Sequence, residues 1–161
     1  AGIQWPCPNK NHAGTTFLHK DSFAKGNGYF APVDFKQESE VADKEYPYFL
    51  IAGRQEFYFN TGTMTRKSPI LEREFPNGLV EINPNDANEL KVKTGWKVKI
   101  ESRHGELVTT VLITTAVPEK LVFIPFHFKE GAANLLLGNS NLDPKSKIPE
   151  FKVCSVKISS T

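Results

Sequence analysis

Short runs of apolar and β-branched residues dominate the chain from Tyr46 onward and predict a β-rich domain. Each run is bounded by Gly, Pro, Asn or Asp, which is typical of strands separated by turns. Partial alternation on either side of His104-Gly105 indicates two strands joined by a hairpin turn at those residues. The expected strands are Tyr48–Ala52, Leu79–Ile82, Lys97–Ser102, Glu106–Thr115, Leu121–Ile124 and Phe151–Ile158.

Helices are expected to be few and short. Asn83-Pro84 predicts a helix start, because Asn is a favoured cap and Pro is favoured at the first helical position. This helix should run to about Lys91, before Thr94-Gly95. Two further short helices are expected, from Ser68-Pro69 to Arg73 and near Ala132 to Leu137. Six or more short strands with sparse helices favour a closed or partly closed β barrel.

Residues 1–45 follow a different pattern, rich in Pro, Gly and polar residues and with little periodicity. They predict an irregular arm or linker that ends in the polar connector 36–45, and the barrel is expected to occupy residues 46–161. The aromatic side chains of the arm are expected to pack on another surface. These are Trp5, Phe17, Phe23, Tyr29 and Phe30.

Composition and charge narrow the class of protein. The chain has 161 residues, of which 39% are hydrophobic and 24% charged, as in a globular domain that buries a core. Its 20 basic and 18 acidic residues give a net charge of +2, which argues against nucleic acid or an anionic membrane as a partner. No apolar run approaches the roughly 20 residues of a membrane span.

The chain shows no catalytic motif of its own. Cys7 and Cys154 lie near opposite ends and are expected to be free thiols, with pairing as the alternative. The four histidines do not stand at metal-ligand spacing, so no zinc site is expected. Glycine-rich phosphate loops and nucleophile-elbow patterns are also absent from the sequence.

The segment from Ala52 to Ser68 carries chemistry suited to an anion. It combines glycine, several hydroxyls, Arg66 and Lys67, and it contains no acid after Glu56. Arginine offers a planar fork of donors, and glycine lets backbone N–H groups approach phosphate oxygens closely. By composition alone, an exposed turn between two strands would fit equally well.

That segment is one of an ordered series of blocks that resemble a known family. The chain resembles the C-terminal domain of molybdenum or tungsten oxidoreductases that carry molybdopterin guanine dinucleotide, above all the catalytic (alpha) subunit of formate dehydrogenases. The blocks span nearly the whole chain and read GIQWPCP, FAKGNGYFAPV, EYPYFLIAGR, TGTMTRKSPIL, VEINPNDANEL, VFIPFHFKE and LDPKSKIPEFKVCSV.

The resemblance implies a mainly β fold, a double-psi (aspartate-decarboxylase-like) barrel with a few short helices and an irregular N-terminal arm. It implies molybdopterin guanine dinucleotide as cofactor, with molybdenum or tungsten in the whole enzyme, and the rest of the catalytic subunit as partner. Metal ligands and catalytic residues belong to other domains of the family. The chain is therefore expected not to turn over formate alone, and the isolated domain can lack the cofactor. It reads as an excised domain or a separate subunit, cytoplasmic or, for the parent enzyme, periplasmic.

Family motifs also imply which residues contact the cofactor. At Tyr58 and Asn60 the family often has histidines, and at Leu137 it has Thr, so the local match is weaker there. For His127 the alternative is a core histidine, and for Lys152 it is a solvent-facing lysine. The expected cofactor-binding residues are Gly53, Arg54, Tyr58, Asn60, Thr61, Thr63, Thr65, His127, Asn134 and Lys152.

Three other functions are alternatives to this one. A related enzyme such as nitrate reductase, arsenate reductase or a formylmethanofuran dehydrogenase component would share the barrel. A non-enzymatic double-psi barrel that binds protein would need neither the TGTMTRKS loop nor the terminal PEFKVC segment. A self-processing decarboxylase would need a Gly-Ser cleavage pair, which the sequence lacks.

Overall fold

The computed structural model describes residues 2–75, 77–139 and 141–161. The chain divides into two units, Ala1–Lys36 and Gln37–Thr161. The first unit is an irregular arm whose described residues contain no helix or strand, only a bridge between Phe23 and Gly26. The connector 37–45, expected to group with the arm, makes its contacts with the barrel unit.

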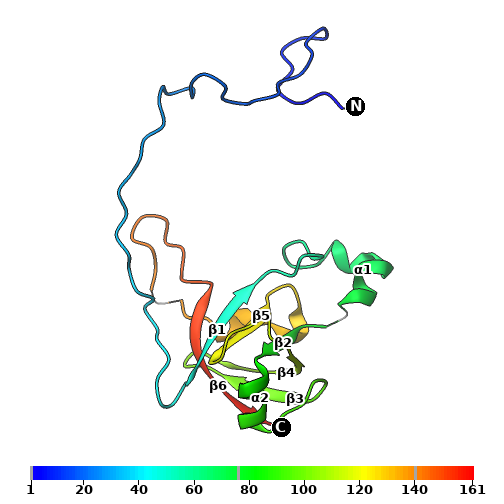
Figure 1. Cartoon of the computed structure of the whole chain (residues 1–161), viewed down its shortest axis with the longest axis vertical. Coiled ribbons are helices and arrows are strands. Elements are labelled where there is room, and N and C mark those ends of the chain that lie inside the picture. The colour runs from blue at the N-terminus through cyan, green and yellow to red at the C-terminus, as the bar shows by residue number, and fades with distance from the viewer. Residues whose placement is uncertain (1, 76, 140) are drawn as a thin grey trace. The chain divides into compact units, whose positions relative to one another are not determined.

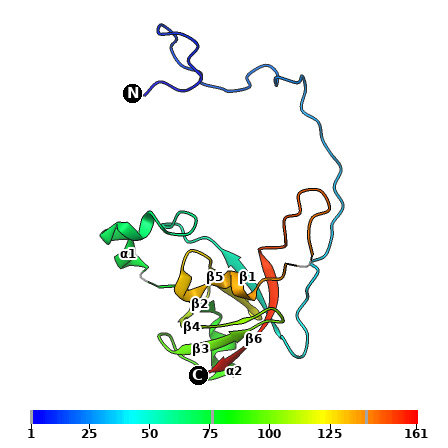
Figure 2. The ribbon, with the colours of Figure 1, turned by 180° about the vertical axis from the view of Figure 1, so that it is seen from behind.

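The second unit is a closed barrel of six strands (Figures 1 and 2). The strands are β1 (Tyr48–Gly53), β2 (Leu79–Ile82), β3 (Lys97–Glu101), β4 (Glu106–Ile113), β5 (Leu121–Pro125) and β6 (Val153–Ser160). Their order around the barrel is β1-β5-β2-β4-β3-β6. The pairs β1–β5 and β2–β4 are parallel and the others are antiparallel. The mainly β, double-psi barrel predicted from the sequence is confirmed.

Alternation along each strand builds the barrel core. In β1 the inward residues Tyr48, Leu50 and Ala52 are buried, while their neighbours are half-buried. Apolar residues from all six strands meet inside, where burial of each large side chain stabilises the fold by about 1.5–3 kcal/mol. The fully enclosed members include Leu50, Val80, Ile82, Val98, Ile100, Val122, Ile124 and Val156.

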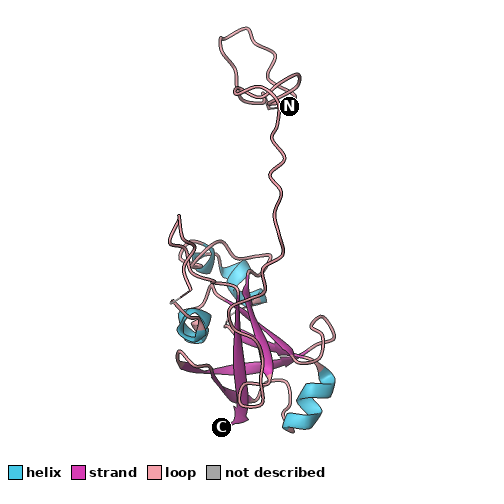
Figure 3. Ribbon diagram, turned by 90° about the vertical axis from the view of Figure 1, so that its left-hand side faces the viewer, coloured by secondary structure: helices cyan, strands magenta, loops and turns pink. Residues whose placement is uncertain are grey.

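Helices are few and lie outside the barrel strands (Figure 3). Helix α2 (Pro84–Leu90) begins where predicted, with the Asn83 side chain accepting from the Asn85 N–H at 2.9 Å, and ends at Lys91, whose φ is 57°. Helix α1 (Pro69–Glu74) follows Ser68 as predicted. The third expected helix is a 3₁₀ turn, η3 (Ala133–Leu136), and two more 3₁₀ turns are η1 (Thr65–Lys67) and η2 (Lys129–Gly131).

The last strand starts later than the sequence predicted. β6 begins at Val153, which pairs with Ile51, whereas Phe151 and Lys152 are exposed and precede the strand. The loop 138–152 therefore runs up to the barrel wall before pairing begins.

The aromatic side chains of the arm are largely exposed, although the Phe23 ring lies 5.1 Å from that of His19. Tyr29 is 88% exposed and Phe30 97% exposed, and Trp5, Phe17 and Phe23 are exposed as well. Within the described ranges, no helix has the length and apolar character needed to cross a membrane.

Candidate functional site

A pocket of about 280 Å³ beside the end of β1 brings together three predicted site residues. Arg54 follows β1, Asn134 lies on η3, and Lys152 immediately precedes β6. The other lining residues are Ala52, Phe126 and Phe151.

The strand pairing of β1 explains why residues so distant in sequence meet here. β1 lies between β5 and β6, so the last residue of β5 and the first residue of β6 both lie beside the end of β1. The Phe126 N–H donates to the Gly53 carbonyl at 3.1 Å, and the Ala52 N–H donates to the Lys152 carbonyl at 2.9 Å. These backbone bonds hold Phe126 and Lys152 on either side of Arg54.

The pocket offers two cations, an amide and two aromatic rings. The Arg54 guanidinium carbon lies 5.8 Å from the centre of the Phe126 ring, within the range of a cation–π contact. Phe151 is 51% exposed and also lines the pocket. Cations bind phosphate oxygens, rings stack on heterocycles, and an amide both donates and accepts. The arrangement suits an anionic ligand that contains a planar ring.

Gly53 has a packing role beside this pocket. A Cβ built at Gly53 would lie 2.3 Å from the Phe123 Cε2 atom, so any larger residue would displace that ring. The glycine thereby lets β1 and β5 approach with Phe123 in place.

His127 anchors the loop that carries Arg54. Its ring is 2% exposed, and Nε2 accepts from the Gln55 N–H at 3.0 Å. Because a backbone N–H can only donate, Nε2 carries no proton, and Nδ1–H donates to the Asn60 carbonyl. His127 is thus a core histidine, the alternative considered from the sequence, and it is not among the residues that line the pocket.

Tyr58 also points into the protein. It is 4% exposed, and its hydroxyl lies 2.5 Å from the Phe75 carbonyl and 3.1 Å from the Glu72 carboxylate. Burial, followed by the Glu72 carboxylate, raises the pKa of Tyr58 to about 12. The structure does not bring this hydroxyl to the pocket.

The predicted threonines divide into two kinds. Thr65 is buried, and its hydroxyl accepts from the Phe59 N–H at 3.1 Å, so it stabilises the turn. Thr61 and Thr63 are exposed on the same loop. Asn60, also exposed, accepts from Arg54 Nη2 at 3.4 Å, which connects this loop to the pocket.

Arg66 is held by two carboxylates that the sequence did not identify as its partners. Its guanidinium lies 3.0 Å from Glu72 and 2.8 Å from Glu130, and it stands over the Phe128 ring. Hydrogen bonds from Arg66 lower the pKa values of both carboxyl groups. Arg66 therefore joins α1 to η2.

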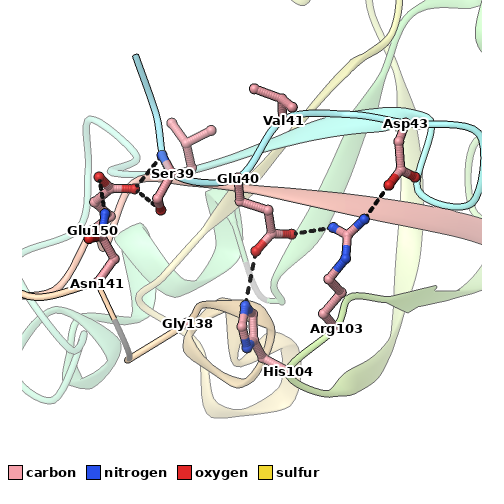
Figure 4. A pocket seen from close by; sticks show the side chains of 10 residues that line it. Ser39, Glu40, Val41, Asp43, Arg103, His104, Gly138, Asn141 and Glu150 are labelled. Carbon is pink, nitrogen blue, oxygen red and sulfur yellow. Dashed lines mark hydrogen bonds and ion pairs between the residues drawn. The ribbon is translucent and has the colours of Figure 1, made fainter. Parts of the chain in front are cut away.

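A second pocket, of about 580 Å³, lies where the connector 37–45 meets the β3–β4 hairpin and the loop 138–152 (Figure 4). Glu40 is its hub. One carboxylate oxygen accepts from the Ser155 N–H at 2.9 Å and from Arg103 at 3.0 Å, and the other lies 2.9 Å from His104 Nε2.

Arg103 extends this network to Asp43 and stands 4.5 Å from the centre of the Tyr46 ring. The sequence did not predict this site, because a polar run such as 36–45 is typical of a solvated connector. The partners of Glu40 lie more than 60 residues away in the sequence, so no local pattern indicates the pairing. Its polar groups are paired with one another, so the network ties the connector to the barrel.

Fold and pocket together define a closed β-barrel domain with cations and aromatic rings suited to an anionic, ring-containing ligand. The family described as the molydopterin dinucleotide binding domain matches residues 48–155, and the chain belongs to this family. Its cofactor is of the molybdopterin type.

The chain is similar to parts of much longer proteins. It is 46% identical over 159 residues to the F420-dependent formate dehydrogenase subunit alpha of Methanocaldococcus jannaschii, covering 98% of this chain and 24% of that protein. It is 35% identical over 162 residues to the assimilatory nitrate reductase catalytic subunit of Bacillus subtilis, covering 98% of this chain and 23% of that protein. The chain thus spans about a quarter of the length of these relatives.

A solved structure shows the same relationship. Acetylene hydratase from Pelobacter acetylenicus is 25% identical with a TM-score of 0.61, and the match covers 73% of this chain and 19% of that one. The barrel therefore recurs within enzymes of different reactions.

Proposed function

We propose that this chain holds molybdopterin guanine dinucleotide within a molybdenum or tungsten formate dehydrogenase. The convergence of Arg54, Asn134 and Lys152 on one pocket carries the proposal, because the three come from separate parts of the sequence. The similarity to formate dehydrogenase alpha subunits over 98% of the chain supports the choice of parent enzyme.

The donor set fits a dinucleotide. Arg54 and Lys152 would neutralise phosphate oxygens, and the Asn134 amide would pair with the edge of the base. The rings of Phe126 and Phe151 would stack on it and exclude water. At about 280 Å³ the pocket would enclose one part of the dinucleotide. Asn60, Thr61 and Thr63 would add donors from the neighbouring exposed loop.

When bound, the cofactor supplies the redox-active metal, molybdenum or tungsten. This chain contributes binding and orientation, which can lower a barrier by several kcal/mol without any contact with substrate. Among its described residues there is no cluster of His, Cys, Asp and Glu that could hold a metal ion. We therefore propose that the domain acts only with the rest of the catalytic subunit. Residues 1–45 would link the barrel to that part of the subunit. We place the whole enzyme in the cytoplasm.

A related oxidoreductase is the second candidate. The similarity to a nitrate reductase, at 35% identity over the same share of the chain, favours it over a protein-binding barrel. Formate dehydrogenase is preferred because the identity is higher there, at 43–46%.

Calorimetric titration of the chain with guanosine diphosphate tests the proposal. We expect Arg54→Ala to weaken binding by at least about tenfold, since a charge-assisted contact to phosphate contributes about 1.5–3 kcal/mol. Arg73→Ala is the matched control, because Arg73 is exposed and pairs with Glu74 on α1. Equal affinities for the Arg54 variant and the parent chain would contradict the assignment.

A further inference from the structure

The loop 138–152 contributes residues to both pockets. Gly138, Asn141 and Glu150 line the pocket at the connector, whereas Phe151 and Lys152 line the cofactor pocket. Figures 1 and 2 show this loop, in brown, extending from the barrel before it enters β6.

The outer part of the loop has little apolar anchorage. Its residues 142–148 are exposed, including Leu142 at 43% and Ile148 at 57%. The Asp143 carboxylate accepts from the N–H groups of Lys145 and Ser146, so the tip is stabilised by its own turn. The position of the base, where Phe151 and Lys152 lie, must therefore be set by other contacts.

Glu150 makes several of these contacts, beside the backbone bridge between Leu142 and Pro149. One carboxylate oxygen accepts from the Ser39 N–H at 3.2 Å and from the Ser39 hydroxyl at 2.6 Å. The other accepts from the Asn141 amide at 2.7 Å, which closes the base of the loop (Figure 4). Glu150 thus ties the residues that follow it to the connector.

The next residues transmit this position to the cofactor pocket. Lys152 is two residues beyond Glu150, and its carbonyl accepts from the Ala52 N–H at 2.9 Å. On the connector side, Ser39 is adjacent to Glu40, whose carboxylate bonds to Ser155, Arg103 and His104 fix the connector on the barrel.

We propose that Glu150 is a positioning residue, which couples the seating of the connector 37–45 to the Phe151–Lys152 wall of the cofactor pocket. The coupling rests on the proposed nucleotide function of that pocket. A protein in which the connector is lifted should bind the nucleotide more weakly, and bound nucleotide should in turn hold the connector on the barrel.

Glu150→Gln tests the coupling with almost no change in shape. The two carboxylate oxygens face donors from Ser39 and from Asn141, and a Gln amide would turn its NH₂ group toward one of them. In the full 161-residue chain without nucleotide, hydrogen exchange should rise at least about tenfold at the Ser39 and Ala52 amides. Ser39→Ala should act in the same direction with a smaller effect, and Glu45→Gln, an exposed carboxylate on the same connector, should change neither amide.

Guanosine diphosphate affinity completes the test through a double-mutant cycle. Glu150→Gln should weaken binding about fivefold in the parent chain and clearly less in a Lys152→Ala background, where Phe151 is all that remains of the wall through which Glu150 acts. Unchanged exchange at Ala52, or equal losses of affinity in both backgrounds, would overturn the proposal. If the parent chain binds no nucleotide, the proposed function fails, while the exchange at Ala52 still decides whether Glu150 positions the wall.

Discussion

One imidazole organises the loop on which Arg54 depends. His127 receives the Gln55 N–H at one nitrogen and donates to the Asn60 carbonyl from the other, so a single side chain fixes both ends of that loop. Phe126 and Tyr58 lie against the same ring, with centroids 4.6 and 5.7 Å away. The loop's conformation therefore depends on one buried imidazole ring.

Tyr58 provides a test at the same scale. We expect Tyr58→Phe to lower the free energy of unfolding by about 1 kcal/mol, because the hydroxyl bonds to the Phe75 carbonyl and Glu72 are lost while the ring stays packed. Thermal unfolding would measure the loss. Guanosine diphosphate affinity should stay within about twofold, and a larger drop would restore Tyr58 to the cofactor contacts.

The sequence predicts residue types for the candidate site, but it does not predict the direction in which each side chain points. Arg54, Asn134 and Lys152 stood in motifs with anion-binding chemistry and do share a pocket. Tyr58, Thr65 and His127 stood in the same motifs and have internal partners instead. Which side of a loop faces inward depends on tertiary packing, and neither composition nor spacing reports that.

Among the elements, α2 shows how local sequence and tertiary contacts combine at one residue. The Asn83 oxygen caps the helix through the Asn85 N–H, and its amide donates to the Val117 carbonyl at 2.9 Å. The cap was visible in the sequence, whereas the bond to Val117 was not.

We expect Asn83→Ala to cost about 1–2 kcal/mol of stability, since both the cap and the bond to Val117 disappear. Asn83→Asp should cost less, because it keeps the cap acceptor and loses only the donor. Denaturant unfolding would compare both with Asn88→Ala, an exposed position on the same helix. An alanine variant at position 83 as stable as the Asn88 control would contradict the double role.

The strands were predicted well because their burial alternates and their ends carry turn signals. β2 has the predicted bounds, and β1, β3, β4 and β5 differ only at their ends. The start of β6 was placed two residues early, since Phe151 continues the apolar pattern. In the barrel Phe151 lines a pocket, and an exposed aromatic residue beside a strand cannot be told from a strand residue by pattern alone.

At the scale of the whole molecule, the connector is joined to the barrel by a pH-sensitive carboxylate. Burial raises the pKa of Glu40, but the hydrogen bonds from Ser155 and His104 outweigh it, so the pKa lies below its usual value of 4.5. Because the folded-state pKa is lowered, ionised Glu40 stabilises the fold at pH values above its unfolded-state pKa. That contribution is lost as the pH falls through the folded-state value.

We therefore expect the unfolding free energy of the chain to fall as the pH is lowered from 6 to about 3.5, and to fall less steeply in Glu40→Gln. At pH 7 the variant should be less stable by about 1–2 kcal/mol, because Gln cannot accept all the bonds of the carboxylate. Urea unfolding across this range would measure both effects, with the exposed Glu45→Gln as control. Parallel pH profiles for parent and Glu40 variant would contradict the role of Glu40.

Closure of the barrel also sets the order in which a ribosome can produce a folded domain. β1 and β3 each form a ladder with β6, so both remain open-edged until Val153–Ser160 has been synthesised. Open strand edges recruit strands from other molecules. The edges of β1 and β3 that face β6 therefore stay unpaired until that strand has emerged, although their other edges can already pair with β5 and β4.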